Sequence, residues 1–102
     1  MSEELANLFK GFNKEEKEKF LEGMSILDDA ISRKIIAKAA SPHSPVAIDE
    51  FPEFSETSMA RHLHLLAGAK LLQPVWEGSK KKFAITDFGR AVDTTIHNDN
   101  PQ

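Results

Sequence analysis

Apolar residues recur at helical spacing through the first 40 residues of the chain. Several of them follow the charged run Lys14–Lys19 and give one helix an apolar face. Asn13 stands before this run, and asparagine is favoured at helix N-caps, so this helix is expected to begin there. An earlier helix is expected to begin after Ser2, with an apolar stripe that consists of Leu5, Leu8, Phe9 and Phe12.

A further apolar stripe predicts a third helix that ends near Ala40. Either Asp28 or Asp29 is expected to cap it, because aspartate accepts hydrogen bonds from the free N–H groups of a first helical turn. A proline-containing loop follows, and Val46–Ile48 is expected to form a short extended segment.

Two more helix starts are predicted after this loop. Asp49 is expected to cap a brief helix, which Pro52 shortens because it disfavours helical geometry in the residue before it. Ser55 is expected to cap the next helix, over about 56–68.

The pattern then changes to that of a β-hairpin. Val75–Trp76 and Lys81–Ile85 predict two strands, and Glu77–Lys80 predicts the turn between them. Either Thr86 or Asp87 is expected to cap a final helix, whose apolar stripe consists of Phe88, Val92 and Ile96.

This order of elements predicts a mainly α fold with a small β-hairpin (α+β), namely a winged helix-turn-helix with extra N- and C-terminal helices. We expect a single domain over 1–97. Its tri-helical core and wing are expected at 28–85, and the flanking helices at 1–27 and 86–97. The remaining segment, 98–102, is expected to be a disordered tail, because it has no apolar residue to bury.

Composition narrows the class of protein. The 102 residues and 40% hydrophobic content suit one soluble domain. With no cysteine, the chain has no disulfide, no thiolate chemistry and no cysteine-ligated metal. Neither a signal peptide nor a membrane span is visible, so a cytoplasmic location is expected. The net charge of −3 argues mildly against a nucleic-acid partner unless basic residues gather on one face.

The helix over 56–68 carries the candidate chemistry. At helical spacing its apolar residues fall on one arc, and short or polar residues fall opposite. Short hydroxyl side chains at its start would allow close approach to the DNA major groove, and Arg61 can reach a guanine edge or a phosphate. The free N–H groups of the first turn can face a phosphate. The residues expected to contact DNA from this segment are Ser55, Thr57, Ser58, Arg61 and His64.

The hairpin is expected to add a basic patch. Gly78 permits a tight turn, and Lys80, Lys81 and Lys82 follow it. Lysines on a ribbon beside a DNA-reading helix would lie along the phosphate backbone, and Lys70 is expected to extend the patch.

Two segments resemble a known family. Ser55–Leu72 resembles the recognition-helix signature of the ArsR-like winged-helix repressors, in which a serine-led helix contains a His-Leu pair and ends in glycine near Leu-Leu. Phe83–Arg90 is similar to the "Leu-Thr-Asp-x-Gly" element that closes the wing in ArsR-, MarR- and PadR-type regulators. The resemblance covers about 28–97. The chain departs from the metal sensors of the family, because it lacks their cysteine pair.

The resemblance implies a transcriptional regulator, namely a homodimeric repressor that binds a two-fold symmetric operator of double-stranded DNA. It carries DNA-contact roles onto Ser55, Thr57, Arg61 and the wing lysines. In these families terminal helices form the dimer interface. The corresponding candidates are Leu5, Leu8, Phe9, Phe12, Val92 and Ile96.

Other functions are weighed against this one. No motif of an enzyme is present, and no cofactor is expected. Asp93 and His97 are one helical turn apart, but two ligands do not make a metal site. His62 is expected to pack and hydrogen-bond locally. Trp76 is expected to pack in the core or at the base of the wing, with stacking on nucleic acid as the lesser alternative. The alternative function is a winged-helix protein–protein interaction module within a larger assembly.

Overall fold

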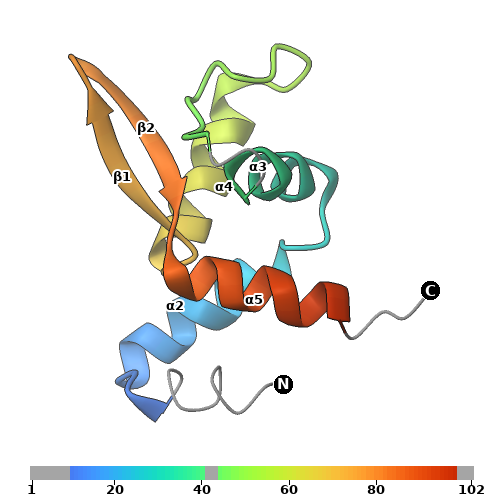
Figure 1. The fold of residues 1–102 in the computed structure, drawn as a ribbon, viewed down its shortest axis with the longest axis vertical. Helices are drawn as coiled ribbons and strands as arrows, with labels where there is room; N and C mark the ends of the chain where they lie inside the picture. The colour runs from blue at the N-terminus through green and yellow to red at the C-terminus, as the bar shows by residue number, and fades with distance from the viewer. Residues whose placement is uncertain (1–9, 41–43, 99–102) are drawn as a thin grey trace.

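The computed structural model describes residues 10–40 and 44–98, and the side chains of the last helix as far as Asp93. Within these ranges the chain forms a winged helix of the α+β class, which confirms the predicted fold (Figure 1). Residues 1–9, where the first helix was predicted, lie outside the described part. The elements in chain order are α2 (Lys14–Ser25), α3 (Ala30–Ala40), α4 (Glu56–Gly68), β1 (Leu72–Glu77), β2 (Lys80–Ile85) and α5 (Asp87–Asn98).

Each of these helices begins at a side chain that the sequence predicts as a cap. At α2 the cap is reciprocal: Asn13 Oδ1 accepts the Glu16 N–H at 2.8 Å, and Glu16 Oε1 accepts the Asn13 N–H at 3.0 Å. Where the sequence left two candidates, the structure selects one, Asp29 for α3 and Thr86 for α5. Ser55 caps α4 as expected.

The brief helix predicted after Asp49 does not form. Turns replace it, with hydrogen bonds from Glu50 N–H to the Ala47 carbonyl at 3.1 Å and from Phe54 N–H to the Phe51 carbonyl at 3.0 Å. The reason is Pro52, which disfavours helical geometry at the residue before it. The segment between α3 and α4 is therefore an irregular loop.

The β1–β2 hairpin, called the wing below, is antiparallel and extends further toward the core than predicted. Gly78 occupies its turn with φ of +66°, a left-handed conformation that glycine adopts without strain. Val46 lies along the other edge of β2, where it exchanges two backbone hydrogen bonds with Phe83 at 2.8 and 2.9 Å. The predicted extended segment thus anchors the loop to the wing.

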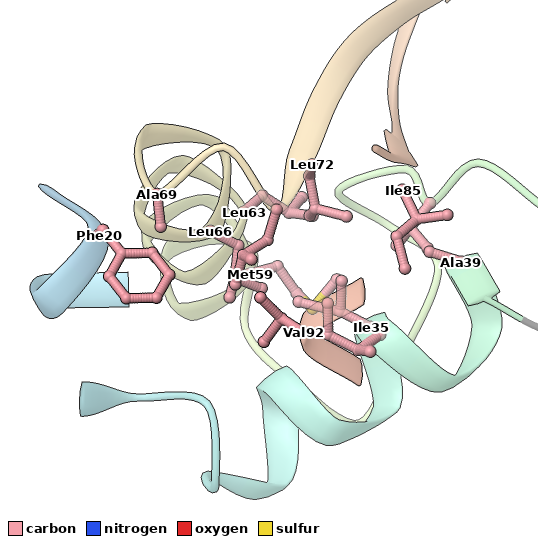
Figure 2. Close-up of a cluster of buried hydrophobic side chains, with 13 residues drawn as sticks. Phe20, Ile35, Ala39, Met59, Leu63, Leu66, Ala69, Leu72, Ile85 and Val92 are labelled. Carbon is pink, nitrogen blue, oxygen red and sulfur yellow. The ribbon is translucent and has the colours of Figure 1, made fainter. Parts of the chain in front are cut away.

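Residues of α4 occupy the centre of the core (Figure 2). Met59, Leu63 and Leu66 are at most 1% exposed, as the apolar arc of this helix predicts. The flanking helices belong to the same core, because Phe20 of α2 and Val92 of α5 are buried in it. Burial of these apolar side chains, rather than helix propensity, stabilises a helix of this length.

Two residues expected at a dimer interface have partners within the chain. Val92 is only 3% exposed, so the chain's own core accounts for its apolar character. Phe12 packs with Phe20 and Phe88 at ring-centroid distances of 6.2 and 5.3 Å. The other interface candidates lie outside the described backbone or side chains: Leu5, Leu8, Phe9 and Ile96.

Candidate nucleic-acid interface

The outer face of α4 is exposed as its sequence predicts. Thr57, Arg61 and His64 lie opposite the buried arc and are open to solvent. Within the described part of the chain no carboxylate pairs with Arg61 or His64. The guanidinium of Arg61 is therefore available to a phosphate or to a base edge.

The two serines at the start of α4 interact with each other. Ser55 Oγ accepts the Ser58 N–H at 3.1 Å and donates to Ser58 Oγ at 3.0 Å. Both hydroxyl groups therefore serve the cap, and Ser58 is half-buried. Thr57 keeps an exposed side chain at this end, beside backbone N–H groups that a helix start leaves without helical partners.

His62 fixes α4 against α3. It is buried, and its Nδ1 donates to the Ser58 carbonyl oxygen at 2.7 Å, the local hydrogen bond that the sequence predicts. The contact of Nε2 is non-local: it lies 3.1 Å from Asp29 Oδ2 but off the line of a hydrogen bond. The imidazole lowers the pKa of the Asp29 carboxyl, and the Ile31 N–H lowers this pKa further.

This contact predicts a loss of stability in acid. Because the folded-state pKa of Asp29 is below its unfolded value, the carboxylate stabilises the fold above about pH 4, and this contribution is lost as pH falls through the folded pKa. Asp29→Asn keeps a good N-cap but removes the charge. The difference in unfolding free energy between the wild type and this variant should therefore shrink as pH falls below about 4.

Urea denaturation over a pH series measures this difference. Asp28→Asn is the matched control, because it removes the same charge one residue away, where the carboxylate pairs with exposed Arg33 rather than with His62. If the unfolding free energies of Asp29→Asn and of the wild type fell in parallel as the pH is lowered, Asp29 would not be the source of this loss of stability in acid.

The three wing lysines differ in their partners. Lys80 Nζ lies 3.1 Å from Asp49 Oδ1, and Lys82 Nζ lies 2.8 Å from Glu77 Oε1. Accordingly Lys80 lowers the pKa of Asp49, and Glu77 raises the pKa of Lys82. Lys81 has no carboxylate partner among the described residues, and its Nζ lies 5.3 Å from the centre of the Phe83 ring.

Lysines of α3 hold the loop between α3 and α4. Lys38 pairs with Glu50, and this contact lowers the pKa of the Glu50 carboxyl. Lys34 pairs with Glu53 in the same way. The acidic loop is thus tied to α3 at these two pairs and to the wing at Asp49.

Lys70 does not extend the basic patch. Its Nζ lies 2.6 Å from Glu16 Oε2 and 5.6 Å from the centre of the Phe12 ring, so the side chain is directed to α2. Its backbone has φ of +68°, which turns the chain sharply between α4 and β1.

The sequence therefore identifies the basic residues, but it does not reveal that carboxylates pair with Lys70, Lys80 and Lys82. The acidic residues of segment 49–53 could have indicated part of this pairing, because they carry charge opposite to that of the wing and α3 lysines. Sequence separation hides the pairing, because Asp49 and Lys80 are 31 positions apart. Of the predicted cationic contacts, Arg61 and Lys81 remain without a carboxylate partner in the described part of the chain.

The described residues contain no group of three or more side chains suited to hold a metal ion. His97, half of the pair considered in the sequence, lies beyond the described side chains. No described helix is both long and apolar enough to cross a membrane.

Comparison with known proteins bears on the fold. No protein-family model matches the chain, and no curated protein matches it significantly. A solved structure, described as the crystal structure of a possible transcriptional regulator for arsenical resistance, superposes with a TM-score of 0.58 and 17% identity. The match covers 76% of this chain and 82% of that one. At this identity the likeness establishes a shared winged-helix fold.

Proposed function

We propose that the protein binds double-stranded DNA as a transcriptional regulator, with α4 in the major groove and the wing on the phosphate backbone. The observation that carries this proposal is Arg61, an exposed arginine without a carboxylate partner in the described chain, on a helix whose opposite face forms the core. Exposed Thr57 at the start of the same helix allows close approach to base edges. The description of the structural neighbour as a regulator adds support.

The finer features of the proposal follow from the resemblance of α4 and the wing to ArsR-like repressors. We propose that the protein is a repressor and acts as a homodimer on a two-fold symmetric operator. Sedimentation of the full chain tests the dimer.

A salt titration tests DNA binding. Fluorescence anisotropy with a mixed-sequence duplex at about 50 and 200 mM salt should show affinity that falls steeply with salt, because phosphate contacts release counterions. Because Lys80 and Lys82 must leave Asp49 and Glu77 to bind phosphate, the slope should be smaller than the number of nearby cations suggests. Absence of binding at the lower salt concentration would refute the function.

Arg61 is expected to supply base preference. Arg61→Ala should cost about 1–3 kcal/mol on duplexes selected from a random library and should reduce the gap to unselected DNA. Arg61→Lys should keep the salt dependence but lose the preference, because lysine lacks the bidentate fork. Arg33→Ala is the control, because this α3 arginine is already paired with Asp28. Equal losses on selected and unselected duplexes would instead assign Arg61 to a phosphate.

The alternative function is a protein–protein module, and one observation favours it. Carboxylates neutralise Lys80 and Lys82, so the wing is less basic than its sequence predicts. A module of this kind would co-purify with a stoichiometric protein partner and would not retain duplex DNA at low salt.

A further inference from the structure

Trp76 is an exposed aromatic residue on the wing. Its side chain is 65% exposed, so the expectation that it packs in the core or at the wing base is wrong. It lies on β1, two residues before Gly78 of the turn. Tryptophan is enriched where proteins contact other molecules, because its large ring carries apolar area and one hydrogen-bond donor.

The strand register places Trp76 with Lys81 on one face of the wing. The two residues are directly opposite each other, and the pair Leu72 and Ile85 lies four positions closer to the core. Because side chains alternate along a strand, both pairs share a face. This face begins in the core at Leu72 and Ile85 and ends at the tip with an exposed indole and an ammonium group.

The two faces of the wing tip differ in charge. Lys80 and Lys82 alternate with Lys81 along β2, and each is paired with a carboxylate. Lys81 has none in the described chain, and its position near the Phe83 ring agrees with a shared face, because these residues are two apart. A polyanion would therefore meet uncompensated positive charge at Lys81.

The wing tip is placed where it could contact the same DNA duplex as α4. In Figure 1 the tip of the wing and the start of α4 lie at the same end of the molecule. A duplex bound at the start of α4 would therefore lie at the same end of the molecule as the wing tip.

We propose that Trp76 and Lys81 form the wing's contact with duplex DNA. Lys81 binds a phosphate, and the Trp76 ring packs on the sugar of the same strand at the edge of the minor groove, where proteins often place apolar side chains. Lys80 and Lys82 contribute less, because their carboxylate partners already neutralise them. The proposal rests on the proposed DNA binding and assigns the contact to one face of the wing.

Intrinsic fluorescence tests the position of the indole. The chain has one tryptophan and no tyrosine, so Trp76 supplies essentially all its emission at long excitation wavelengths. Acrylamide quenching of the full-length protein should be strong without DNA and should fall at least about twofold with saturating mixed-sequence duplex, because a contact at the indole excludes the quencher. Anisotropy of a labelled duplex, measured in parallel, reports binding itself.

The two measurements separate the outcomes. Bound DNA with unchanged quenching would overturn the proposal and leave DNA binding intact. No bound DNA at low salt would overturn both. Bound DNA with protected Trp76 supports the proposal.

Substitutions on the two faces give the sharper comparison. Lys81→Ala should reduce the salt slope by about 1, and Lys80→Ala should reduce it by less. Trp76→Ala should weaken binding about tenfold, whereas Trp76→Phe should retain most of the affinity, because it keeps an apolar ring. Leu21→Ala is the control for loss of an exposed apolar side chain, because Leu21 of α2 is 61% exposed.

These variants also have a clear contrary result. A reduction of the salt slope in Lys80→Ala as large as that in Lys81→Ala would overturn the assignment of the DNA contact to one face of the wing. Thermal melting of each variant shows whether it folds. Because these side chains are exposed, little change in melting temperature is expected.

Discussion

Gly89→Ala is expected to destabilise the protein by about 3 kcal/mol, although alanine is ordinarily the better helix former. Gly89 lies in the first turn of α5, and a Cβ atom there would come well within 3.0 Å of the Leu71 carbonyl oxygen and 2.9 Å from Ile85 Cγ1. The carbonyl belongs to the backbone, so it cannot move away by a change of rotamer. Accommodation requires α5 to shift from the start of β1.

The contacts around Gly89 join three elements. Thr86 Oγ1 accepts the Gly89 N–H at 2.8 Å and donates to the Lys70 carbonyl oxygen at 2.6 Å, and the Thr86 N–H donates to the Leu71 carbonyl at 3.0 Å. The end of α4, the base of the wing and the start of α5 therefore meet here. This geometry gives a physical reason for threonine and glycine in the element that resembles the wing-closing motif.

Gly68→Ala is the matched control. Gly68 is the last residue of α4, and a Cβ there would meet nothing within 4 Å. This substitution should be neutral or should stabilise by up to about 1 kcal/mol. Urea denaturation of both variants measures the contrast, and a Gly89→Ala protein as stable as the Gly68→Ala protein would show that the close packing at α5 is not required.

Met59→Ala is expected to cost about 3 kcal/mol of unfolding free energy, because this side chain lies fully buried on the core face of α4. The substitution removes apolar contacts and leaves a cavity that the neighbouring Leu63 and Ile35 can fill only in part. Since Arg61 lies on the opposite side of the same helix, a loosened α4 should also weaken DNA binding.

Met59→Leu provides the comparison, because it nearly conserves volume and should cost less than about 1.5 kcal/mol. Both variants are measured by denaturation, and their DNA affinity is then compared under conditions in which each is fully folded. A loss in Met59→Ala no larger than in Met59→Leu would mean that the core collapses around the missing side chain.

The brief helix predicted after Asp49 shows how a local rule competes with another. Asp49 and Glu50 favour a helix start, but Pro52 acts on the residue before it and prevents the turn from continuing. The resulting loop places Asp49 against Lys80 and Glu50 against Lys38. The segment predicted as a helix is therefore a loop, and its carboxylates neutralise lysines of the wing and of α3 that the sequence leaves unpaired.

The sequence by itself predicted α2, α3, α4 and α5, the caps of α2 and α4, the hairpin and the two faces of α4. These features depend on residues within a few positions of one another, through the periods of helix and strand and through side-chain hydrogen bonds to nearby N–H groups. Only the tertiary structure decided which cations are neutralised and which wing face carries Trp76 with Lys81. Ion pairs such as Lys80 with Asp49 join residues far apart in the chain, so packing decides them.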